Sequence, residues 1–256
     1  MFRSVHSFNS DGVQIAYEDG GEGQPILLIH GFASNARVNW WDTGWVKTLV
    51  GAGRRVITLD NRGHGASQKI YDPAFYSAAE MAEDARRLLD HLGLDQADIM
   101  GYSMGARIAA FLCINHPSRV NRAIFGGLAS RMITGVPGSD LIAAGLEAPS
   151  LAHVTDPEAR SFRIFAEQTK SDLKALAACM RASRVKVTAA DLARITVPVL
   201  VVAGEKDDIA GDVETLVSAI AGAKGLTLSG RSHMNAVGAK DYKQAVLDFL
   251  RFGENP

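Results

Sequence analysis

Short apolar runs alternate with amphipathic stretches along the first half of the chain. Consecutive apolar residues bounded by turn residues predict buried strands, and apolar positions at helical spacing predict helices. In residues 77–92 the helical spacing is clearest, and Gly93 ends it. The predicted strands are 13–18, 25–30, 55–60, 97–102 and 120–126. The predicted helices are 45–50, 77–92 and 104–116.

The same alternation returns near the C-terminus, after an interval of different character. It comprises strand 198–203, helix 213–221, strand 225–228 and helix 240–252. Alternating strands and helices predict a mostly parallel central sheet flanked by helices on both faces.

The interval between the two halves contains helical patterns and no convincing strand. Asp156 and Pro157 begin one helix, as N-cap and first residue, and residues 171–183 form another. We therefore expect a core domain made of 1–128 and 195–256, with a helical cap, 129–194, inserted into it.

Composition narrows the possible functions. A chain of 256 residues is long enough to bury its own hydrophobic core. A formal net charge of −1 does not favour binding to nucleic acid or to an anionic membrane. Cys113 and Cys179 fit neither a metal site nor a disulfide framework. No apolar run is long enough to span a bilayer. We expect a cytoplasmic protein that acts on a small molecule, with no nucleic-acid or membrane partner.

The sharpest chemical signal is Gly101-Tyr102-Ser103-Met104-Gly105, which matches G-x-S-x-G between a predicted strand and a predicted helix. In that context the serine occupies a tight, strained turn at a helix N-terminus, where backbone N–H groups favour a developing negative charge. Ser103 is therefore the candidate nucleophile, and an N-capping serine is the alternative.

A serine nucleophile requires a base, and the base requires an orienting acid. With this motif the chain order is serine, acid, histidine. Two histidines follow Ser103, and His153 falls in the predicted cap. His233 lies in a loop after the last predicted strand, which makes it the candidate base.

The segment after strand 198–203 reads Gly-Glu-Lys-Asp-Asp, residues 204–208. It resembles the G-x-x-D turn of the α/β-hydrolase superfamily, and this resemblance implies that Asp207 is the acid, with Asp208 as the alternative. The resemblance covers nearly the whole chain except the cap, and it implies the α/β-hydrolase fold.

Two further turns are similar to those of that superfamily. His30-Gly31-Phe32 resembles its H-G-aromatic turn, which implies an oxyanion hole made by the backbone N–H groups of Phe32 and Met104. His30 itself is expected to be structural.

Residues 60–67 resemble the D-x-R-G-x-G-x-S turn, in which Asp60 and Arg62 are expected to hold neighbouring loops. A metal site built from Asp60 and His64 lacks further ligands nearby. We expect no metal and no cofactor.

The substrate pocket is less defined by the sequence. Trp40, Trp41 and Tyr102 are candidate pocket residues, although the two tryptophans could instead anchor the following helix. Four cap arginines could meet an anionic substrate or lie in solvent, namely Arg160, Arg163, Arg181 and Arg184.

These features predict a serine hydrolase that cleaves a carboxylic ester, or a related acyl bond, through an acyl-enzyme. The alternatives within the fold are a C–C bond hydrolase, a cofactor-free haloperoxidase or perhydrolase, and a thioesterase. A haloalkane dehalogenase or an epoxide hydrolase is disfavoured because its nucleophile is an aspartate. A non-catalytic ligand-binding protein is the alternative from another class.

Overall fold

In the computed structural model, which describes residues 5–135, 137–182 and 186–251, eight strands form one sheet. The strand order is β1-β2-β4-β3-β5-β6-β7-β8. β1 and β2 run antiparallel to their neighbours, and every pair from β4 to β8 is parallel. The strands are β1 (His6–Ser10), β2 (Val13–Gly20), β3 (Pro25–Ile29), β4 (Arg55–Leu59), β5 (Ala97–Tyr102), β6 (Val120–Gly126), β7 (Val199–Gly204) and β8 (Lys224–Leu228).

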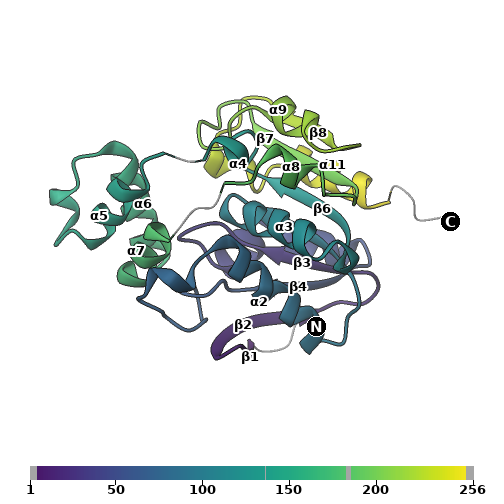
Figure 1. The fold of residues 1–256 in the computed structure, drawn as a ribbon, viewed down its shortest axis with the longest axis horizontal. Helices are drawn as coiled ribbons and strands as arrows, with labels where there is room; N and C mark the ends of the chain where they lie inside the picture. The colour runs from purple at the N-terminus through teal and green to yellow at the C-terminus, as the bar shows by residue number, and fades with distance from the viewer. Residues whose placement is uncertain (1–4, 136, 183–185, 252–256) are drawn as a thin grey trace.

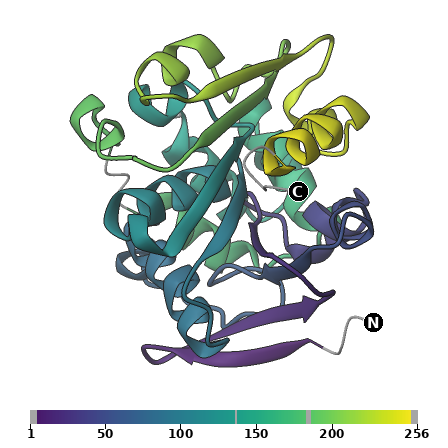
Figure 2. The same cartoon turned by 90° about the vertical axis from the view of Figure 1, so that its right-hand side faces the viewer.

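Helices cover both faces of this sheet, because alternate residues of each buried strand point to opposite sides. Leu27 and Ile29 of β3 join the core formed with α2 and α3, whereas Ile26 and Leu28 join the core formed with α1 and α11. Figure 2 shows α11 and α3 on opposite sides of the strands. The flanking helices are α1 (Trp45–Gly51), α2 (Ala78–His91), α3 (Met104–Asn115), α9 (Val213–Ser218), α10 (His233–Ala236) and α11 (Lys240–Arg251).

Within its described residues, the segment between β6 and β7 contains helices joined by turns and loops, and no strand. Figure 1 shows α5, α6 and α7 grouped to one side of the sheet, which we call the α5–α7 lobe, whereas α4 and α8 lie beside α3 and β7. The boundaries of the expected cap domain therefore stay a prediction. Its helices are α4 (Arg131–Thr134), α5 (Ser139–Glu147), α6 (Pro157–Gln168), α7 (Leu173–Arg181) and α8 (Ala189–Leu192).

The predicted mostly parallel sheet is confirmed. The predicted ends of the strands and long helices agree with the observed ends to within about two residues in most cases. The Asp156 side chain accepts a hydrogen bond from the Ala159 amide, as an N-cap should. The C-terminal ends predicted at 183 and 252 lie outside the described residues. Among those that are described, no helix is long and apolar enough to cross a membrane.

Strand β1 was not predicted, although a signal for it exists. Asp11 and Gly12 both have positive φ, at 51° and 86°, and together they form the two-residue turn of a hairpin between β1 and β2. Asp-Gly is a strong hairpin signal because this turn needs two left-handed residues.

Candidate active site

Ser103 lies at the sharp turn between β5 and α3. Its φ and ψ are 56° and −114°, a strained conformation for a residue with a side chain. The turn is possible because two glycines let α3 approach the sheet. A Cβ on Gly105 would lie 2.0 Å from the Ile29 carbonyl oxygen, and one on Gly101 would lie 2.1 Å from the Gly105 carbonyl oxygen.

Three side chains predicted from separate segments meet at this turn. Nε2 of His233 lies 3.1 Å from the Ser103 hydroxyl oxygen, and Nδ1 lies 2.9 and 3.0 Å from the two carboxylate oxygens of Asp207. Asp207 is buried, and the amides of Ile209 and Ala210 donate to it. The neighbouring Asp208 is exposed, so the tertiary structure favours Asp207 as the partner of His233.

The His30–Phe32 turn packs directly against Ser103. A Cβ on Gly31 would lie 3.4 Å from the Ser103 Cβ. In the described part of the chain, neither the Phe32 nor the Met104 amide donates a hydrogen bond to another residue. Both amides are therefore available as donors, and the oxyanion hole expected from them stays a prediction.

Buried histidines support this turn from behind. The His30 ring lies 2.7 Å (Nδ1) from the Gly31 carbonyl oxygen and accepts from the Asn61 amide at 3.0 Å (Nε2). Burial lowers the pKa of His30, and it lowers the pKa of His64, with a contribution from His30, to about 3. Both rings therefore stay neutral at ordinary pH, and His30 has the structural role expected of it.

The 60–67 turn is held by charge-assisted hydrogen bonds, also as expected. The Asp60 carboxylate accepts from the amides of Ala36 and Ala66. Arg62 forms two hydrogen bonds of 2.7 Å with the buried carboxylate of Asp84 in α2. This turn is therefore fixed both to the loop after Phe32 and to the helix behind it.

The α5–α7 lobe contacts the same turns from the other side. The Phe162 ring in α6 meets the Phe32 ring edge-to-face at 5.8 Å, and the Thr169 hydroxyl donates to the Ala33 carbonyl at 2.9 Å. In α7, the Cys179 sulfur lies 3.9 Å from the Met104 sulfur. The lobe therefore rests on both residues that carry the free amides.

Comparison with known proteins agrees with this arrangement. Residues 24–137 match the model of the alpha/beta hydrolase fold family. A hydrolase from Pseudomonas aeruginosa superposes over 96% of this chain and 98% of its own, with a TM-score of 0.80 and 28% identity. The chain has the α/β-hydrolase fold. A bromoperoxidase from Bacillus anthracis superposes similarly, over 97% of this chain and 100% of its own, with a TM-score of 0.75 and 27% identity.

The curated relatives of this chain differ in activity. A 2-hydroxymuconate semialdehyde hydrolase of Pseudomonas putida is 38% identical over 148 residues, which cover 56% of this chain and 49% of the relative. A non-heme chloroperoxidase of Kitasatospora aureofaciens is 36% identical over 115 residues, 44% of this chain and 40% of the relative. The chain thus spans about half the length of the curated relatives it matches.

The contacts of the two tryptophans favour the anchoring role over the pocket role. Trp40 is fully buried and packs against Trp45 in the core beside α1. The Trp41 indole donates to Glu18 in β2 at 2.6 Å. Both side chains anchor the segment before α1, which is the alternative that the sequence left open.

The pocket role expected of Tyr102 stays a prediction. Its side chain is buried, and its hydroxyl donates to the backbone carbonyl of His233 at 2.5 Å. Alternation along β5 accounts for this direction, because Tyr102 lies on the same face as Met100 and joins the same core.

The described arginines of the expected cap contact other residues of the segment between β6 and β7. Arg163 is buried and donates to three carbonyls at the end of α5 and to Glu167. Arg181 pairs with Glu147, and Arg160 donates to the Leu151 carbonyl. Arg184 lies outside the described residues.

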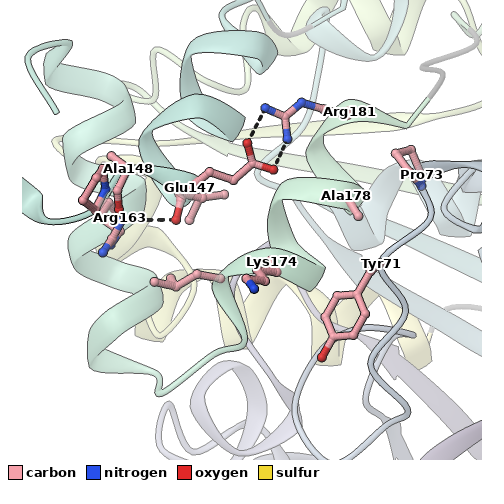
Figure 3. A pocket seen from close by; sticks show the side chains of 11 residues that line it. Tyr71, Pro73, Glu147, Ala148, Arg163, Lys174, Ala178 and Arg181 are labelled. Atoms are coloured by element: carbon pink, nitrogen blue, oxygen red, sulfur yellow. Dashed lines mark hydrogen bonds and ion pairs between the residues drawn. The ribbon is translucent and has the colours of Figure 1, made fainter. Parts of the chain in front are cut away.

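Arg163 and Arg181 line a groove of about 610 Å³ between the lobe and the 71–73 segment. Figure 3 shows the Glu147–Arg181 pair on one side of it and Tyr71 and Pro73 on the other. Ser103, Asp207 and His233 are not among its lining residues. Within the described ranges, no group of three or more His, Cys, Asp or Glu side chains is arranged to hold a metal ion.

Proposed function

We propose that this protein hydrolyses a carboxylic ester of a small molecule, with Ser103, His233 and Asp207 as a catalytic triad. The observation that carries the proposal is the continuous chain of contacts from the Asp207 carboxylate through both His233 nitrogens to the Ser103 hydroxyl. A hydroxyl, an imidazole and a carboxylate in this order are the groups that acyl transfer to water requires.

The geometry supports the following sequence of steps. His233 Nε2 takes the Ser103 proton as the serine oxygen attacks the ester carbonyl, and the amides of Phe32 and Met104 hold the oxyanion. His233 then gives this proton to the leaving alcohol, so that an acyl-enzyme remains. A water molecule, activated by His233, releases the acid and restores the serine.

Asp207 has a separate part in this scheme. Its contact with Nδ1 selects the His233 tautomer that leaves Nε2 free to accept a proton, and its negative charge stabilises the imidazolium that forms. The buried Asp207 carboxylate, fixed by two amides, holds the ring in one orientation.

The same triad could serve a C–C hydrolase or a perhydrolase, which the curated relatives also represent. The cap contacts favour the ester proposal. Arg160, Arg163 and Arg181 use their guanidinium groups on cap carbonyls and carboxylates, so they do not offer a ready partner to an anionic substrate.

The test is hydrolysis of p-nitrophenyl esters of increasing acyl length by the wild type, Ser103→Ala and Ser150→Ala. We expect Ser103→Ala to lose at least about 10³-fold in kcat, because the nucleophile is gone and only binding and the oxyanion hole remain. Ser150, at the start of an exposed turn of the cap, is the matched control and should retain activity.

A fluorophosphonate probe separates the remaining possibilities. It should label the wild type and Ser150→Ala at Ser103 and leave Ser103→Ala unlabelled. Labelling without turnover of any ester would contradict the esterase proposal and favour another bond. No labelling at all would favour a ligand-binding role.

A further inference from the structure

The Tyr102 side chain joins the strand that carries Ser103 to the loop that carries His233. Its hydroxyl donates to the His233 carbonyl at 2.5 Å, across 131 positions of sequence. Its ring centroid lies 5.4 Å from that of the imidazole. Because Tyr102 precedes Ser103 directly, one residue contacts both partners of the serine–histidine pair.

The Tyr102 ring packs closely against the backbone at the end of β6. A Cβ on Gly127 would lie 2.7 Å from the ring, and one on Gly126 would lie 3.0 Å from it. The Ser103 amide donates to the Gly126 carbonyl at 2.7 Å. The ring, the nucleophile and the end of β6 are thus held in one rigid unit, from which the hydroxyl reaches the His233 loop.

The hydroxyl remains a donor at working pH. Burial raises the pKa of Tyr102 well above its ordinary value, and the negative charge of Asp207 acts in the same direction. The hydrogen bond to the His233 carbonyl therefore persists through the range in which a serine hydrolase works.

We propose that Tyr102 is a positioning residue that sets the His233 imidazole at hydrogen-bonding distance from Ser103 through the His233 backbone. The inference rests on the proposed triad. The ring of His233 is fixed on one side by Asp207, and the hydrogen bond from Tyr102 fixes the backbone from which that ring extends. Without it, the loop can move while its sequence and the triad side chains stay intact.

The first test compares Tyr102→Phe with Tyr242→Phe. Tyr102→Phe keeps the ring in place and removes only the donor. We expect kcat to fall about 10-fold with little change in KM, because a small misplacement of a reacting group lowers the rate without weakening substrate binding. Tyr242 is the matched control. It is a buried tyrosine of α11 whose hydroxyl has no hydrogen-bond partner among the described residues, so kcat should stay within about 2-fold of the wild type.

A second variant moves the Tyr102 ring and keeps its hydroxyl. In the Tyr242→Phe background, Gly126→Ala places a methyl group 3.0 Å from the Tyr102 ring and 3.0 Å from the Cζ atom of residue 242. That background is required because the methyl would otherwise lie 2.1 Å from the Tyr242 hydroxyl oxygen. The expected result is the same selective fall in kcat, and it does not depend on Tyr102→Phe folding well.

A spectroscopic measurement separates this inference from the proposed function. In NMR spectra, the proton shared by His233 Nδ1 and Asp207 should resonate far downfield in the wild type and in Tyr242→Phe. It should broaden or disappear in Tyr102→Phe. This readout needs no substrate, so it stands even if no ester is hydrolysed. An unchanged kcat and an unchanged proton signal in Tyr102→Phe would overturn the inference, and so would a lower melting temperature as its sole effect.

Discussion

At the scale of single residues, the site depends on side chains whose direction is fixed by several contacts at once. Asp207 faces His233, accepts two amides and is buried, whereas the adjacent Asp208 faces solvent. The two carboxylates are adjacent in the chain but have different surroundings. Asp207 is placed to orient His233, whereas Asp208 is exposed to solvent.

This difference gives a prediction at the same scale. Asp207→Asn should lower kcat by about 10³- to 10⁴-fold, because the amide can stabilise the wrong His233 tautomer and cannot stabilise the imidazolium. Asp208→Asn should change kcat by less than about 2-fold. Steady-state kinetics with one p-nitrophenyl ester checks both variants, and equal losses in the two would contradict the assignment.

At the scale of elements, the α5–α7 lobe touches the turn that carries the Phe32 amide. Phe162 packs on Phe32, and Thr169 donates to the carbonyl of the next residue, Ala33. Ala33 has a φ of 57°, which a residue with a side chain rarely adopts, so this turn needs support from its neighbours. The lobe supplies part of it.

Removing one contact between lobe and turn should therefore affect activity. Phe162→Ala should lower kcat/KM by up to about 10-fold, since an edge-to-face aromatic pair contributes about 0.5–1.5 kcal/mol beyond its buried area. Leu141→Ala is the control, because Leu141 lies in the same lobe with an exposed side chain. Kinetics on a short and a long ester measure the effect, and an unchanged kcat/KM in Phe162→Ala would show that the lobe does not support the turn.

At the scale of the whole molecule, neutral histidines are buried beneath the active-site turn. His64 is fully buried with a pKa of about 3, and His30 is likewise buried with a lowered pKa. In the unfolded chain both take up a proton near pH 6.5. Folding must therefore exclude these protons when the solution becomes acidic.

The sign of the effect follows from proton binding. Between about pH 6.5 and pH 3 the unfolded state holds a proton that folded His64 lacks, so the free energy of unfolding decreases as the pH falls. His64 alone contributes a slope of about 1.4 kcal/mol per pH unit in this window. Above about pH 6.5 the contribution is constant.

The prediction is that His64→Gln flattens this slope, whatever its stability at neutral pH. Urea unfolding at several values between pH 4.5 and 7 measures it. His153→Gln is the control, because His153 is exposed in the segment between β6 and β7 and should leave the slope unchanged. Equal slopes in His64→Gln and the wild type would contradict the buried, neutral state of His64.

The sequence by itself determined the order and type of the main elements and the turn that carries Ser103. Those features are local: apolar period, turn residues and the glycines of the Ser103 turn act over a few positions. The order of the motifs also selected His233, and the resemblance of residues 204–207 to the G-x-x-D turn implied Asp207, with Asp208 left open. Strand β1 could have been predicted in addition, because Asp11-Gly12 is a local signal.

Only the tertiary structure decided the surroundings of these residues. Trp40, Trp41 and Tyr102 are all near the site in sequence, yet their side chains turn to the core beside α1, to β2 and to the His233 carbonyl. Tyr102 meets its partner 131 positions away, and Phe162 meets Phe32 across the α5–α7 lobe. Such contacts depend on how the elements pack, and no local pattern encodes them.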